Sequence, residues 1–129
     1  MNNLSKIKQI IIKKPQRLDC GKDISNFPLA YETYGNLNEK KDNAILIFHA
    51  LTGDQFVSGL NPVNNKEGWW NYAVGPGKAL DTDKFFVICA NVIGGCMGSY
   101  GPSTIDKNTN KPIGTNFPVI TINDMVNAQ

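Results

Sequence analysis

The segment best suited to chemistry is HALTG at residues 49–53, which directly follows the apolar run AILIF at residues 44–48. His49 is the only histidine of the chain, and imidazole is the side chain whose ordinary pKa suits a base near neutral pH. A single histidine at the end of a strand is nevertheless more often structural. The backbone of residues 49–53 therefore has to be considered as well as the side chain of His49.

A second candidate is GGCMG at residues 94–98, which matches G-x-C-x-G, the cysteine form of a nucleophile elbow. Cys96 and His49 would then form a nucleophile and base pair. An elbow must lead straight into a helix, however, and the next residues, SYGP at 99–102, do not start one. The favoured interpretation is that the glycines permit positive φ angles or close backbone approach beside a pocket. The serine form, G-x-S-x-G, does not occur in the sequence.

Metal and nucleotide sites have little support. The three cysteines and His49 lack the paired spacing of a zinc site. GPG at residues 75–77 is a turn, since it belongs to no complete phosphate-binding motif. Trp69 and Trp70 are more typical of packing than of a ligand platform. We expect no metal and no bound cofactor.

Composition excludes several other classes. The net charge is +2, with only two pairs of adjacent lysines, so we expect no nucleic-acid partner. No apolar run approaches the ~20 residues that span a bilayer, so we expect no membrane partner. Three widely spaced cysteines do not form a disulfide framework, and we expect a cytoplasmic protein.

The pattern of apolar residues predicts an α/β fold. Residues 9–13 and 29–34 read as strands of an antiparallel hairpin, the second alternating apolar and polar residues. Residues 44–48 and 85–90 are continuously apolar, which is typical of parallel strands covered on both faces. The segment between them is long enough for a crossover, and residues 69–80 could supply part of a helix.

The last third of the chain reads as a long loop followed by a helix. Glycine, proline, asparagine and serine dominate from Val92 to Pro118. Thr121 can cap a helix that begins at Ile122, with Asp124 favourable in its first turn. We expect residues 1–129 to be the N-terminal part of one α/β domain, with no second domain and a break inside a βαβ unit.

In an α/β-hydrolase layout, the loop after such a strand supplies a backbone N–H to the oxyanion of the tetrahedral intermediate. The triad runs in the order serine, acid, histidine in that layout, so His49 comes too early to be its base. The turn away from the strand makes Leu51 the expected N–H donor.

Short motifs cover nearly all of the chain from Phe27 onward: FPLAYETYGNLN at 27–38, HALTG at 49–53, GWW at 68–70, GPG at 75–77, DT at 81–82, FFVICAN at 85–91, GGC at 94–96, GS at 98–99, GP at 101–102, FP at 117–118, TI at 121–122 and DMV at 124–126. Taken in order, this set resembles the N-terminal third or so of the homoserine O-acetyltransferase family.

The resemblance implies an α/β-hydrolase fold and ping-pong acyl transfer. A serine takes the acyl group from acyl-CoA and passes it to the hydroxyl of L-homoserine, on the route to methionine. The family's serine, aspartate and histidine would lie beyond Gln129, as would its substrate-binding arginine, so we expect the chain alone to be inactive. The full-length form is expected to be a homodimer.

Only part of the family's site can be carried over to this sequence. Leu51 matches the oxyanion donor, Thr52 and Gly53 the same loop, and a second stretch would wall the pocket with Asn91, Gly94, Gly95 and Cys96. The choices between acetyl-CoA and succinyl-CoA as donor, and between homoserine and serine as acceptor, stay open. Two alternative hypotheses are a non-catalytic binding or assembly fragment and a Cys96-dependent hydrolase.

Overall fold

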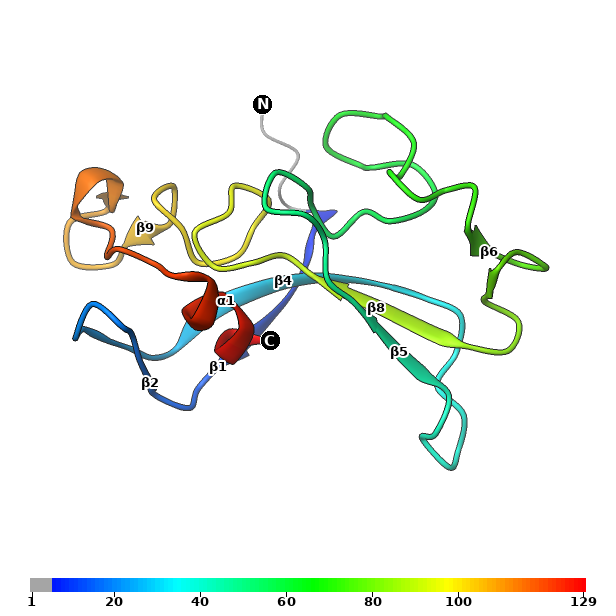
Figure 1. Ribbon diagram of the computed structural model, residues 1–129. Helices are drawn as coiled ribbons and strands as arrows, with labels where there is room; N and C mark the ends of the chain where they lie inside the picture. Colours follow the sequence, from blue (N-terminus) through cyan, green and yellow to red (C-terminus); the bar gives the residue numbers. More distant parts are fainter. Residues whose placement is uncertain (1–5) are drawn as a thin grey trace. The chain divides into compact units, whose positions relative to one another are not determined.

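The computed structural model describes residues 6–129, which form a small mixed sheet, long loops and one α-helix (Figure 1). The main sheet has the strand order β1-β4-β8-β5 and consists of Lys8–Ile12, Phe27–Tyr34, Phe86–Ala90 and Ala44–Ile47. The remaining strands form two-residue pairs: β2 and β3 (Gln16–Arg17, Asp23–Ile24), β6 and β7 (Val74–Gly75, Leu80–Asp81), and β9 and β10 (Ile105–Asp106, Lys111–Pro112). A 3₁₀ helix covers Gly114–Asn116 and α1 covers Ile122–Ala128.

The central pairings of the sheet agree with the sequence pattern. Strand β8 runs parallel to β5, with Ile47 opposite Cys89, and antiparallel to β4, with Tyr34 opposite Val87. The predicted parallel pair is thus confirmed.

The contacts divide the described chain into two compact units, residues 6–8 with 31–90 and residues 9–30 with 91–129.

The first unit has an apolar core beneath β5 and β8. Ile47, Val57, Val74, Val87 and Cys89 are buried, and the last four are fully inaccessible. Tyr34, Ile45, Trp70 and Leu80 pack against this cluster. Burial of one such aliphatic side chain stabilises the fold by about 1.5–3 kcal/mol. Four of these nine residues therefore come from the crossover segment between the two strands.

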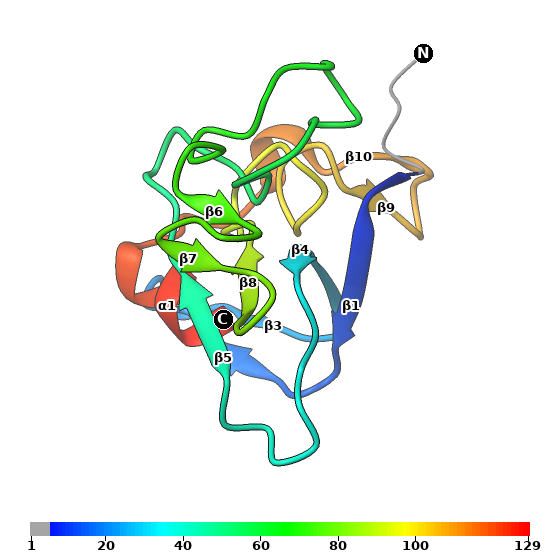
Figure 2. The same cartoon turned by 90° about the vertical axis from the view of Figure 1, so that its right-hand side faces the viewer.

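Two expectations for this unit are wrong. Residues 69–80 form turns and the β6–β7 pair, not a helix (Figure 2), because Gly75 and Gly77 have positive φ angles of 151° and 67° around Pro76. Strand β5 is not covered on both faces within the described residues, where Leu46 and Phe48 are 44% and 57% exposed. An apolar run predicts a strand, but what covers each face depends on the rest of the fold.

The second unit is organised around Asp124 in the first turn of α1. Its carboxylate accepts hydrogen bonds from the Asp19 N–H at 3.0 Å and from the Thr121 N–H and hydroxyl at 2.9 and 3.1 Å. The Thr121 hydroxyl in turn accepts the Asp124 N–H, which completes a capping box. The helix start predicted at Thr121 is confirmed, and the same carboxylate fastens the helix to the turn between β2 and β3.

The buried carboxylate predicts a pH-dependent stability. Burial alone raises the pKa of Asp124, but the hydrogen bonds from Thr121 and Asp19 outweigh it and leave the pKa below its usual range. A carboxyl group whose pKa is lower in the folded state than in the unfolded chain stabilises the fold. This stabilisation is complete at pH values above the pKa of the unfolded chain and is lost as the pH falls through the pKa of the folded state. Asp124→Asn should therefore lower the free energy of unfolding by about 1–3 kcal/mol at neutral pH and flatten the acid side of its pH profile.

Urea unfolding between pH 3 and 7 measures both effects. Asp23→Asn is the control, since Asp23 forms only an exposed ion pair with Arg17 and should contribute less than about 0.5 kcal/mol. An unchanged acid slope in Asp124→Asn would contradict the assignment.

Candidate functional site

The turn that follows β5 brings a backbone donor to the surface. The Gly53 N–H donates to the Ala50 carbonyl at 2.7 Å, closing a turn with Leu51 and Thr52 at its corners. Leu51 is 66% exposed. Within residues 6–129 its N–H has no hydrogen-bond partner. The geometry thus leaves the predicted donor directed away from the rest of its turn.

His49 lies under this turn and not in solvent. Its side chain is buried, and the ring Nδ1 is 2.7 Å from the Ala50 carbonyl oxygen. A carbonyl only accepts hydrogen bonds, so Nδ1 carries the proton in this contact. The structural interpretation of His49 fits this placement, because its Nδ1 is occupied by the backbone.

The cavity beside the turn has a volume of about 230 Å³. Thr52 and Gly53, both predicted as pocket residues, line it. The other lining residues are mostly polar: Asp54, Phe56, Asn61, Asn64, Lys66, Glu67 and Trp69. Sequence reasoning missed this polar group, although the clustering of aspartate and asparagine with Gly53 and Gly59 is typical of a loop built on side-chain hydrogen bonds.

Asp54 organises the wall of that cavity. Its carboxylate accepts the Phe56 N–H at 2.9 Å and the Asn61 side-chain amide at 3.2 Å, and its carbonyl accepts the Trp69 indole N–H at 3.0 Å. Trp69 stacks on Trp70 at a centroid distance of 5.5 Å. Trp70 packs against the apolar core, as predicted, whereas Trp69 is 41% exposed and lines the cavity. Asp54 thereby connects the turn to Phe56, Asn61 and Trp69 of the loop that follows it.

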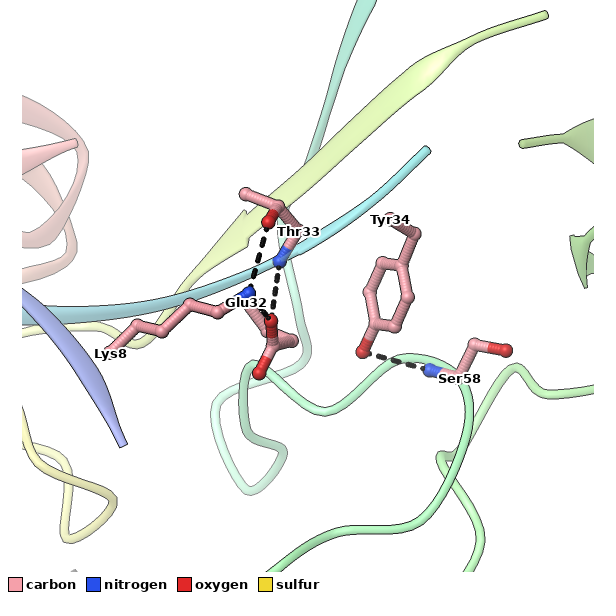
Figure 3. A network of polar contacts seen from close by, with 5 residues as sticks. All are labelled: Lys8, Glu32, Thr33, Tyr34 and Ser58. Carbon is pink, nitrogen blue, oxygen red and sulfur yellow. Dashed lines mark hydrogen bonds and ion pairs between the residues drawn. The ribbon is translucent and has the colours of Figure 1, made fainter. Parts of the chain in front are cut away.

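A tyrosine on β4 fixes the next part of the loop. The Tyr34 hydroxyl accepts the Ser58 N–H at 3.1 Å, as Figure 3 shows. Burial raises the pKa of Tyr34 to about 12, so the phenol stays neutral at physiological pH. On the same strand, Glu32 pairs with Lys8, and both of these side chains bond to Thr33 (Figure 3). The Tyr34 contact thus holds the loop to β4, and the other contacts join Lys8 of β1 to the same strand.

The glycine-rich stretch belongs to the second unit and folds back on β4. The Asn91 N–H donates to the Ala30 carbonyl at 2.8 Å. The Ser99 hydroxyl donates to the Asn91 carbonyl at 2.6 Å and accepts the Ala30 N–H at 2.9 Å. The stretch after β8 is thus anchored to β4 at both ends of this bend.

Two glycines have the backbone features that the sequence suggested, and their place beside a pocket stays a prediction. Gly94 has a φ of 85°, and a Cβ at Gly95 would lie 2.6 Å from the Asn91 Oδ1 atom. Cys96 is exposed, and turns follow it where an elbow needs a helix. The nucleophile-elbow interpretation of Cys96 therefore lacks its structural context.

The predicted pocket residues are thus divided between the units, with Leu51, Thr52 and Gly53 in the first and Asn91, Gly94, Gly95 and Cys96 in the second. No group of three or more potential metal ligands occurs among residues 6–129. Across the same residues, no helix has the length and apolar character needed to cross a membrane.

Comparison with known proteins gives consistent results. No protein-family model matches the chain. The chain is 77% identical to a homoserine O-acetyltransferase of Pelagibacter ubique (strain HTCC1062), over 100% of this chain and 35% of that protein. The chain therefore spans about a third of the length of the curated relatives it matches.

Solved structures show the same extent of similarity. A homoserine O-acetyltransferase from Bacillus anthracis has a TM-score of 0.78 and 32% identity, over 96% of this chain and 35% of that one. Esterase E22 has a TM-score of 0.77 and 36% identity, over 95% of this chain and 36% of that one. The described residues thus have the N-terminal part of an α/β-hydrolase fold.

The Tyr34 contact predicts a measurable loss of stability. Tyr34→Phe leaves the partly buried Ser58 N–H without its acceptor, which should lower the free energy of unfolding by about 1–2 kcal/mol. Tyr72→Phe is the matched control, because Tyr72 is 79% exposed and its hydroxyl accepts only an exposed hydrogen bond from the Trp70 indole N–H at 2.9 Å, so its loss should cost less than about 0.5 kcal/mol. Equal urea midpoints for the two variants would contradict a role for the Tyr34 hydroxyl.

Proposed function

We propose that this chain, which is similar to homoserine O-acetyltransferases over about a third of their length, supplies the oxyanion-binding part of an acyltransferase. The enzyme would transfer an acetyl group from acetyl-CoA to the hydroxyl of L-homoserine. The observation that carries the proposal is the exposed turn at Leu51, which follows the parallel strand β5. Strands β5 and β8 are parallel and end at the same edge of the sheet, where α/β proteins bind their ligands.

The proposed chemistry is covalent acyl transfer through a serine. The serine hydroxyl attacks the thioester carbonyl, and the carbonyl oxygen becomes an oxyanion that the Leu51 N–H and a second backbone N–H stabilise. Collapse of this intermediate expels the CoA thiol and leaves an acyl-serine. The homoserine hydroxyl then attacks the acyl-serine through a second oxyanion, whose collapse breaks the ester bond to the serine, returns a proton to the serine oxygen and releases O-acetylhomoserine. The serine and its triad partners correspond to none of these 129 residues.

The surroundings of the reaction belong to the same proposal. Both substrates are small molecules, the product lies on the route to methionine in the cytoplasm, and the whole enzyme is a homodimer without a bound cofactor. Similarity to esterase E22 favours hydrolysis as the second candidate function, in which water replaces homoserine as the acceptor.

A chimera tests the proposal. The 129 residues replace the matched segment of the Pelagibacter ubique relative, and thiol release from acetyl-CoA is followed with and without L-homoserine. We expect release that requires homoserine and yields O-acetylhomoserine. Release that is independent of homoserine would support hydrolysis, and an inactive chimera would contradict the proposal.

The 129-residue chain alone should release no thiol above the buffer blank, because it contains no serine elbow. Turnover by the chain that Cys96→Ala abolishes would contradict this prediction and would support the cysteine-dependent hydrolase.

Deleting the Leu51 N–H tests the oxyanion role directly. An amide-to-ester replacement at position 51 of the chimera removes the donor and nearly keeps the shape of the turn. Loss of one oxyanion donor lowers kcat by about 10²–10³-fold. The control is the same replacement at Leu37, a leucine that is 43% exposed in the turn after β4. If the two esters have the same kcat, Leu51 is not the donor.

A further inference from the structure

The Ala50 carbonyl receives two hydrogen bonds from within its own turn. The Gly53 N–H and the His49 Nδ1 each lie 2.7 Å from its oxygen. The first bond closes the turn, and any residue other than proline at position 53 could donate it. The second comes from a buried ring that packs beneath the turn, and it depends on the side chain at position 49.

The direction of the Ala50 carbonyl determines the direction of the Leu51 N–H. The two groups belong to one planar peptide unit, and in the trans form they point in opposite directions. No peptide bond in residues 6–129 is cis. Two donors that hold the carbonyl inward therefore hold the N–H outward, and a rotation of this peptide would move both groups together.

We infer that His49 is a positioning residue for the Leu51 N–H and not a base. This inference rests on the proposed function, in which that N–H binds the oxyanion. The ring acts through one donor, Nδ1–H, which is present in one neutral tautomer as well as in the cation. A positive charge is therefore not needed, and a neutral amide that reaches the same oxygen can replace it.

Gly53 fits the same arrangement. A Cβ at position 53 would lie 3.1 Å from the Ala50 oxygen and 3.4 Å from the His49 Nδ1. A side chain at position 53 would press on both partners of this hydrogen bond, and glycine leaves them their space. The segment HALTG thus combines the donor, the ring that orients it and the space that the ring needs.

Three substitutions at His49 in the active chimera test the inference. The amide nitrogen of asparagine can occupy the position of Nδ1, whereas that of glutamine extends toward the position of Nε2, and leucine has no donor. His49→Leu and His49→Gln should lower kcat by about 10–100-fold, less than complete loss of the oxyanion donor, with KM within about twofold. His49→Asn should recover kcat to within about fivefold of the parent.

Equal losses in the asparagine and leucine variants would overturn the inference, and so would a kcat unchanged by leucine. Thermal unfolding of each variant separates misfolding from misorientation, and His49→Gln serves if leucine fails to fold. Ring ¹⁵N shifts of the chimera, with His49 identified by its absence in His49→Asn, give a readout without activity. Protonation at Nδ1 supports the inference, and protonation at Nε2 alone contradicts it, even if the chimera transfers no acyl group.

Discussion

The parallel pairing of β5 with β8 is the constraint on which the first unit depends. Parallel neighbours cannot be joined by a tight turn, so the chain must leave the end of β5, cross, and return to the start of β8. In most parallel units a helix makes this crossing. Here residues 48–85 cross as loops, whose β pairings are the β6–β7 pair and a single antiparallel bridge between Leu60 and Glu67. The packing and polar contacts of this segment have to replace what a helix would supply.

Side-chain hydrogen bonds to the backbone take over that task. Asn71 accepts the Gly59 N–H and the Ser58 hydroxyl, each at 3.0 Å. Asp81 accepts the Gly77 and Asp83 N–H groups at 2.9 and 3.1 Å, and these bonds lower its pKa. Together with Asp54 they give the crossover a series of local caps. The turn at Leu51 is therefore the first bend of a braced loop, which suits a donor that must not rotate.

How well the sequence predicted each feature depends on how far apart in the chain the interacting residues lie. Strand positions and the capping box at Thr121 depend on near neighbours, and they were predicted. The helix expected at residues 69–80 and the buried second face of β5 were wrong, because neither turn propensity nor apolarity specifies distant partners. Tyr34 was missed for the same reason, since it meets Ser58 across 24 positions of the chain. Asp54 was missed although its partners Phe56 and Asn61 are near neighbours in the sequence. The site residues themselves came from ordered short motifs, and their roles stay predictions.

The inaccessible position of Cys89 on β8 has a consequence for the redox behaviour of the chain. Burial, with a smaller contribution from the charge of Asp54, raises the pKa of this thiol to about 12. Only the thiolate reacts readily with oxidants and alkylating agents. Cys20 and Cys96 are exposed, so they would form sulfenic acids or mixed disulfides first. Oxidative damage in this chain would therefore accumulate on its loops and spare the strand at the centre of the sheet.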